Sequence, residues 1–252
     1  MVGILTKVLQ IYIFVETQKK LNGMMTMKIQ KIEPLYLQVY SILRKEVLDG
    51  VYQPGQKLIE SRIATNFGVS RGPVREAMGR LEQEGLVVQK GNYNHVIEYT
   101  EKDVIDVYQC RKALESMAVE LATQYITGKE LVQLEEVLER SEEAFQQGDS
   151  KDIIKNNILF HNIIVSSSRN SSLIEMIGRL SGKITYYRST IIGNYHRNDV
   201  NDDYIEEHRA IFTEIKKRNA ATAKKLMEKH MDSDISAFVT FMNKKQIIKQ
   251  NR

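Results

Sequence analysis

The chain has 252 residues, of which 42% are hydrophobic and 27% charged, a composition that excludes disordered and fibrous proteins and fits a globular one. Its formal net charge of +4 permits a polyanionic partner without demanding one. A lone cysteine, Cys110, excludes an internal disulfide framework and favours a cytoplasmic location, and we expect it to pack within a helix.

The first 28 residues are set apart from the rest by their pattern. An apolar run over Val8–Val15 is too short to span a membrane and is interrupted by polar residues. We therefore expect no membrane partner. Residues 1–28 are predicted to be a disordered extension, or to precede a true start codon at Met24, Met25 or Met27.

Three helices are predicted in residues 29–99. Apolar residues at helical spacing predict a helix over Leu35–Leu48, and a shorter one follows over Glu60–Phe67. A third helix is predicted to begin after Ser70, a good N-cap residue, and to run to about Glu84.

A β-hairpin is predicted to follow the third helix. Short strands over Leu86–Gln89 and Val96–Tyr99 flank a turn over Lys90–Asn94. Three helices and a hairpin in this order are typical of a winged helix-turn-helix domain, in which the hairpin forms the wing.

From Thr100 onward the pattern is helical throughout. Proline is absent from this part and acidic residues follow Thr100, as in the first turn of a helix. Residues 100–243 are predicted to form an all-α antiparallel bundle, followed by a basic tail over 244–252. The fold class is therefore mainly α. The six predicted helices cover about 101–126, 128–147, 150–168, 171–193, 201–218 and 220–243.

Two arginines mark the start of the third helix. Arg71 and Arg75 are four residues apart and project from one face. At a helix N-terminus they can reach phosphates, or pair with guanine edges in the major groove. The alternative is a solvated arginine pair on a surface helix. The hairpin directly downstream favours DNA binding, because Lys90 and Gly91 at its turn offer a second backbone contact.

Residues Leu35 to about Val96 resemble the GntR family of regulators, most specifically in the block GVSRGPVREAMGRLEQEGLV from Gly68 to Val87. The resemblance implies that the chain binds double-stranded operator DNA. Ser61 and Gly72 depart from the usual arginine and threonine, which could alter affinity or operator sequence. The implied DNA-binding residues are Ser70, Arg71, Gly72, Pro73, Arg75, Lys90 and Gly91.

Three histidines of the second half lie on inward helix faces. His161, His208 and His230 each fall within an apolar stripe of a different predicted helix, whereas His95 and His196 fall in the wing and a loop. A single such histidine is usually a hydrogen-bonded core residue. Three that converge are harder to bury without a shared partner, and neutral imidazole is a common ligand for divalent transition metals.

Arg111 is also predicted to point inward, on the stripe of the first helix of the bundle. A buried guanidinium needs an anion. One reading is a salt bridge to an internal glutamate. The other is an arginine that binds the carboxylate of a ligand beside the metal.

The second half resembles the FCD effector domain of the FadR branch of GntR regulators, in segments that begin at Arg111, Phe160, Glu207 and Met227. In its metal-binding members an aspartate and three histidines hold a divalent ion, often zinc or nickel, with an organic acid beside it. The implied metal ligands are Asn157, His161, His208 and His230. The implied or weaker effector-binding residues are Arg111, Tyr108, Tyr187 and Arg188.

Asn157 stands where the aspartate is expected, and a neutral carbonyl is a weaker ligand for a dication. The leading hypothesis is a ligand-responsive regulator, more often a repressor in this family, that binds a palindromic operator as a homodimer and is not an enzyme. One alternative is a metal-free sensor of the same family. Another is a metal hydrolase that uses the three histidines, although no general base is evident near them.

Overall fold

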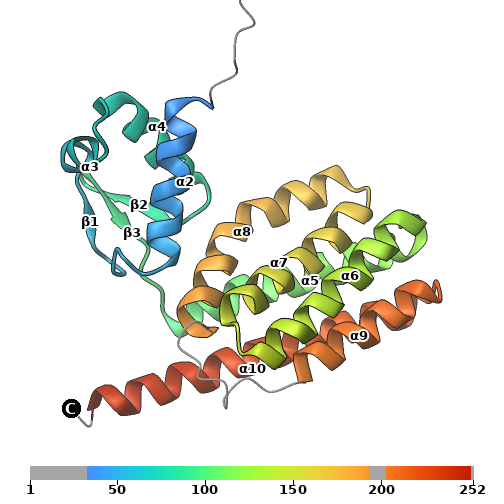
Figure 1. Ribbon diagram of the computed structural model, residues 1–252. Coiled ribbons are helices and arrows are strands. Elements are labelled where there is room, and N and C mark those ends of the chain that lie inside the picture. Colours follow the sequence, from blue (N-terminus) through green and yellow to red (C-terminus); the bar gives the residue numbers. More distant parts are fainter. Residues whose placement is uncertain (1–32, 193–202, 251–252) are drawn as a thin grey trace, which may run out of the picture. The chain divides into compact units, whose positions relative to one another are not determined.

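The computed structural model describes residues 33–192 and 203–250 (Figure 1). The predictions for residues 1–28, for His196 and for the loop around it lie outside the described residues. None of the described helices is both long and apolar enough to cross a membrane. The described elements are α2 (Leu35–Leu48), β1 (Lys57–Leu58), α3 (Glu60–Phe67), α4 (Arg71–Gln83), β2 (Val87–Lys90), β3 (Tyr93–Val96), α5 (Glu101–Tyr125), α6 (Gly128–Gln147), α7 (Ser150–Ser167), α8 (Ser171–Ile192), α9 (Asp203–Lys216) and α10 (Ala220–Gln250).

The predicted winged helix-turn-helix is present. Helix α4 packs on both α2 and α3, and Gly68 joins α3 to α4 with a φ of 65°, a left-handed conformation that favours glycine. Ser70 occupies the N-cap position of α4, but its side chain makes no capping hydrogen bond, contrary to the role we predicted for it. The apolar stripe of α4 is buried, and its members are Val74, Ala77, Met78 and Leu81.

The wing is tighter than predicted. Its second strand runs over Tyr93–Val96 rather than Val96–Tyr99, because Lys90 pairs with Tyr93 across a turn of only two residues. A third strand that the sequence pattern did not indicate, β1, pairs antiparallel with β3. The strand order is therefore β1-β3-β2.

The helical part begins with a capping box, as the acidic first turn suggested. The Thr100 side chain accepts a hydrogen bond from the Asp103 backbone, and Asp103 accepts one from the Thr100 backbone. Helix α5 packs against α7, α8, α9 and α10, so four helices surround it (Figure 1). Helix α10 extends to Gln250, so residues 244–250 of the segment predicted as a basic tail continue this helix. Cys110 lies within α5 but is exposed, contrary to the packing role expected for it.

Candidate functional site

The predicted DNA-reading residues lie on an exposed surface. The Arg71 and Arg75 side chains keep 63% and 69% of their area exposed, and each lies within 3.5 Å of Glu60 Oε2. Glu60 opens α3, so one carboxylate holds both arginines at the start of α4. Exposed pairs of this kind contribute little to stability, which leaves the arginines available to DNA.

The remaining predicted contacts surround these arginines or lie in the wing. Ser70 and Gly72 are exposed at the N-terminal end of α4, and Pro73 is partly exposed. Lys90 and Gly91 are exposed at the wing turn, where Lys90 Nζ donates to Glu98 at 2.7 Å. Helix N-terminus and wing thus each present cationic side chains and backbone N–H groups, which suit phosphate contacts.

The three predicted histidines converge inside the helical part. His161 from α7, His208 from α9 and His230 from α10 are all buried, and ligand atoms of the three lie within 4.8 Å of one another. His230 Nε2 lies 3.1 Å from His208 Nε2 and 3.4 Å from His161 Nε2. Three imidazoles from three helices therefore turn the same ring nitrogen toward one point.

Glutamates contact the Nδ1 atoms of two of the three rings, those of His161 and His230. Glu115 on α5 lies 2.5 Å from His161 Nδ1, and Glu207 on α9 lies 2.8 Å from His230 Nδ1. A carboxylate accepts the Nδ1–H, so we assign the tautomer in which Nε2 of His161 and of His230 carries a lone pair. Lone pairs facing each other at 3.4 Å repel, and a cation between them would remove the repulsion.

Protonation is disfavoured at two of these histidines. Burial, followed by the positive charge of Arg111, holds the pKa of His161 well below its usual value. Burial, followed by His230, does the same for the pKa of His208. Both imidazoles are therefore neutral near pH 7, which is the form that binds metal.

Asn157 suits the fourth ligand position that the family resemblance assigned to it. It lies one turn before His161 on α7, is 5% exposed, and its Oδ1 has no hydrogen-bond partner among the described residues. A buried carbonyl oxygen without a partner carries a desolvation cost that coordination would offset. The three imidazoles suit zinc or nickel, and in such a site Asn157 would add one amide oxygen.

Both arginines predicted to bind the effector are buried, and acids hold them. Arg111 Nε donates to Glu115, and Arg111 Nη1 donates to Asp234 at 3.3 Å. The internal glutamate considered as the alternative partner of Arg111 is thus present. Arg188 Nη2 donates to the same Asp234 oxygen at 2.6 Å, whereas Arg188 Nη1 is buried with no partner among the described residues.

The predicted tyrosines serve other roles than lining the ligand cavity. The Tyr108 hydroxyl accepts from Arg188 Nε at 3.2 Å, which orients that guanidinium from behind. Tyr187 packs against Tyr99, with ring centroids 5.0 Å apart. Neither tyrosine is among the residues that line the cavity beside His161, and their contact with the effector stays a prediction.

A cavity of about 150 Å³ is lined by both arginines and by one of the three histidines, His161. Its apolar walls come from α7 and α8, which include Ile158, Val165 and Ile184. An apolar cavity with a few convergent polar groups is the usual form of a small-molecule site. The polar side chains from the helical part that line it are Arg111, Glu115, His161, Asn162, Ser181, Thr185 and Arg188.

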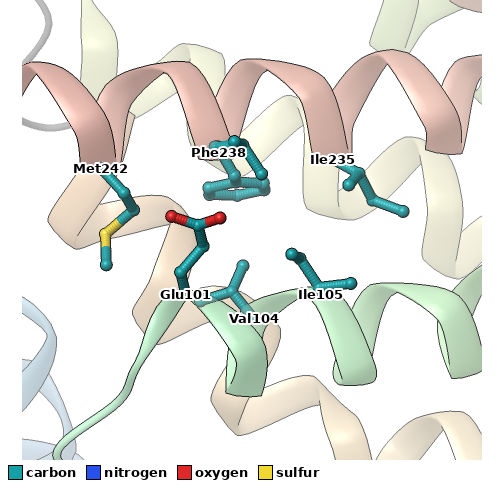
Figure 2. A pocket seen from close by; sticks show the side chains of 7 residues that line it. Glu101, Val104, Ile105, Ile235, Phe238 and Met242 are labelled. Atoms are coloured by element: carbon teal, nitrogen blue, oxygen red, sulfur yellow. The ribbon is translucent and has the colours of Figure 1, made fainter.

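A second hollow, between the N-terminal turns of α5 and the second half of α10, has a different character (Figure 2). Val104 and Ile105 face Ile235 and Phe238 across it, and Glu101 is its one charged lining residue. It has no room for a water molecule. We interpret it as a helix-packing contact rather than a ligand site.

Three acids of the site were not predicted from the sequence: Glu115, Glu207 and Asp234. Each had a signal, because Glu115 follows Arg111 by four residues, Asp234 follows His230 by four, and Glu207 precedes His208. Burial alone would raise the pKa of Asp234, but Arg188, His230 and Arg111 outweigh it and lower the pKa to about 2.

We expect Asp234→Asn to lower the free energy of unfolding by about 2 kcal/mol at pH 7, the equivalent of the lowered pKa. Because the folded-state pKa lies below the unfolded one, this contribution is present above the unfolded value and is lost as pH falls toward about 2. Urea unfolding at pH 7 and pH 3 measures it. Asp232→Asn, which removes an exposed acid of the same helix, is the matched control. An Asp234→Asn deficit of equal size at both pH values would contradict this assignment.

Comparison with known proteins identifies both halves. Residues 35–93 match the model of the bacterial regulatory proteins of the gntR family, and residues 106–233 match the FCD domain. The chain is 37% identical over 209 residues to the uncharacterized HTH-type transcriptional regulator YdhC of Bacillus subtilis, covering 82% of this chain and 92% of that protein. It is 32% identical over 217 residues to the Uxu operon regulator of Haemophilus influenzae, covering 79% of each.

Solved structures agree with these relatives. The structure of E. coli McbR/YncC superimposes with a TM-score of 0.71 and 28% identity, covering 82% of this chain and 97% of that one. A transcriptional regulator from Rhodococcus sp. RHA1 shares the fold, with a TM-score of 0.68 and 22% identity. The family and these relatives are regulators and not enzymes, which overturns the hydrolase alternative. The chain belongs to the GntR family of DNA-binding transcription regulators and carries a C-terminal FCD domain.

Proposed function

We propose that this regulator senses a small organic acid, bound beside a divalent metal ion in its FCD domain, and that ligand binding alters its affinity for operator DNA. The observation that carries the proposal is the convergence of three buried imidazoles whose Nε2 atoms face one point. In this proposal Asn157, His161, His208 and His230 hold zinc or nickel.

The cavity beside the histidines supports a carboxylic acid as the ligand. A bound divalent ion would supply a Lewis-acidic centre for one carboxylate oxygen. Arg188 supports the same ligand class, because its buried Nη1 has no partner among the described residues and Asp234 binds only Nη2 and not Nη1. Guanidinium and carboxylate pair through parallel hydrogen bonds, which gives direction as well as affinity.

The proposal also includes the oligomeric state of the protein and its effect on transcription. We propose a cytoplasmic homodimer of the FadR branch, because a two-fold protein reads the two halves of a palindromic operator. Repression is the proposed effect on transcription. The ligand would shift the balance between arrangements of the two DNA-binding parts that bind the operator differently.

A thermal-shift screen of small carboxylic and sugar acids, each with and without zinc or nickel, tests the ligand class. The protein is purified without a histidine tag, so that metal bound in the cell can be measured first. A stabilising acid whose effect requires the metal supports the proposal. If no metal co-purifies and neither ion changes the melting temperature, the metal-free sensor is the correct alternative.

We expect Glu115→Gln to weaken zinc binding by about 10- to 100-fold, because outer carboxylates orient and activate metal-binding histidines. Glu115 lies 2.5 Å from His161 Nδ1, and an amide cannot accept that proton as strongly. Competition with a zinc chelator measures the affinity. Glu120→Gln is the control, since Glu120 lies on the same helix but pairs with Lys224 at the surface. Equal zinc affinity in the two variants would refute the role of Glu115.

A further inference from the structure

We propose that Asp234 is a tethered stand-in for the carboxylate of the effector. It holds the two buried arginines in the ligand-free protein, and the acid that binds must displace it. This inference rests on the proposed organic-acid site. It adds one step, the displacement of Asp234, which frees the arginines for the ligand and changes the contacts of α10.

The way Asp234 holds the arginines leaves room for a better partner. A single oxygen, Oδ2, accepts from Arg188 Nη2 at 2.6 Å and from Arg111 Nη1 at 3.3 Å. Arg188 Nη1, in a residue only 1% exposed, has no partner among the described residues. A carboxylate that placed one oxygen on each terminal nitrogen of Arg188 would satisfy both, and two-point pairs are the stronger arrangement.

The acid and the cavity approach the arginines from different directions. Arg111 and Arg188 both line the cavity, whereas Asp234 is not among its lining residues. The Asp234 side chain is 19% exposed, against 2% for each arginine. A ligand can therefore reach the guanidinium groups through the cavity, and the displaced carboxylate has a path to water.

Occupancy of Arg188 Nη2 favours exchange over simple addition. Asp234 Oδ2 already accepts from this nitrogen at 2.6 Å. A carboxylate that paired with both terminal nitrogens of Arg188 would bring one of its oxygens against Asp234 Oδ2, and two carboxylates in contact repel each other. Release of Asp234 as the ligand binds removes this repulsion.

Displacement of Asp234 would change how α10 is held. Asp234 lies one helical turn after His230, and its ion pairs join α10 to Arg111 of α5 and Arg188 of α8. When the ligand takes over the arginines, α10 loses these two links and keeps the contact of His230 with Glu207. Occupancy of the cavity is thereby converted into a different attachment of one helix.

Acetate is the probe for this exchange, because it supplies the carboxylate alone. The melting temperature of the full chain is followed as sodium acetate replaces sodium chloride at constant ionic strength and pH 7. We expect acetate to stabilise Asp234→Ala with a half-saturation concentration about tenfold below that of the wild type, since the internal competitor is gone. Asp234→Asn, which keeps the shape of the side chain, should show the same direction and serves if the alanine variant does not fold.

Two controls isolate the effect. Asp232→Ala removes an exposed acid two residues away, paired with Lys112, and should respond to acetate as the wild type does. Arg188→Gln added to Asp234→Asn should abolish the gain. The proposal is overturned if the Asp234 variants respond like the wild type or more weakly, because Asp234 would then not compete with the ligand.

Zinc binding measured on the same preparations separates this inference from the proposed function. Unchanged zinc affinity together with an unchanged acetate response rejects the role of Asp234 and leaves the metal site standing. If the wild-type protein does not bind zinc, the metal site is rejected. The acetate comparison still decides the role of Asp234 in that case.

Discussion

Arg71→Ala and Arg75→Ala are each expected to weaken operator binding by about 10- to 100-fold, the equivalent of roughly 1–3 kcal/mol for a good base contact. Both side chains project from the exposed N-terminal end of α4, and their contact with Glu60 is a surface pair. Their removal should change stability by less than about 1 kcal/mol. Fluorescence anisotropy on a DNA fragment selected by the wild-type protein measures the loss.

The salt dependence of the same binding assay shows what each arginine touches. A side chain that contacts a phosphate lowers the slope of log affinity against log salt by about 1 when it is removed, whereas a base contact mainly relaxes sequence preference. Arg179→Ala is the control, because Arg179 is an exposed arginine of α8 that pairs with Glu175. Operator affinity unchanged in both α4 variants would show that α4 is not the recognition helix.

His208→Ala is expected to abolish specific zinc binding and the stabilisation that zinc provides. At a zinc concentration of one hundred times the Kd, the wild type should gain about 2.7 kcal/mol. For a chain of this size that is a rise in Tm of roughly 5–10 °C. His208 lies 3.1 Å from His230 within the buried cluster, so its loss leaves two imidazoles in the set.

His95→Ala is the matched control for the zinc experiment. His95 lies on β3 of the wing, outside the histidine cluster. The substitution therefore removes the same kind of side chain at a position away from the proposed metal site. Its zinc content and zinc-induced rise in Tm should equal those of the wild type. Equal zinc content in the His208→Ala and His95→Ala variants would show that the histidine cluster does not bind the metal.

The helices were predictable because their signals are local. Apolar spacing and the glycines that end helices placed α2 and α3 within the bounds that the structure has. The wing was misregistered by several residues, because strand limits depend on which backbone groups pair across the turn. The two residues of β1 carry no pattern of their own and become a strand only through β3, far along the chain.

The same distinction between local and distant signals applies to the residues of the site. An inward histidine reveals itself by interrupting an apolar stripe, so His161, His208 and His230 were found and the structure brings them together. Glu115 and Asp234 were missed, because acids are read as surface residues unless a partner is known. Asp234 pairs with Arg188 and Arg111, which lie 46 and 123 residues earlier, and no local pattern indicates pairs at such separations.

The proposed metal-assisted sensing of an acid is tested most directly by the affinity of the full chain for its operator. This affinity is measured with a panel of carboxylic acids in the presence of zinc and of a chelator. We expect at least one acid to change operator affinity by about 5-fold or more, only with zinc and only while Arg188 is intact. An operator affinity that no acid of the panel alters, with or without zinc, would contradict it.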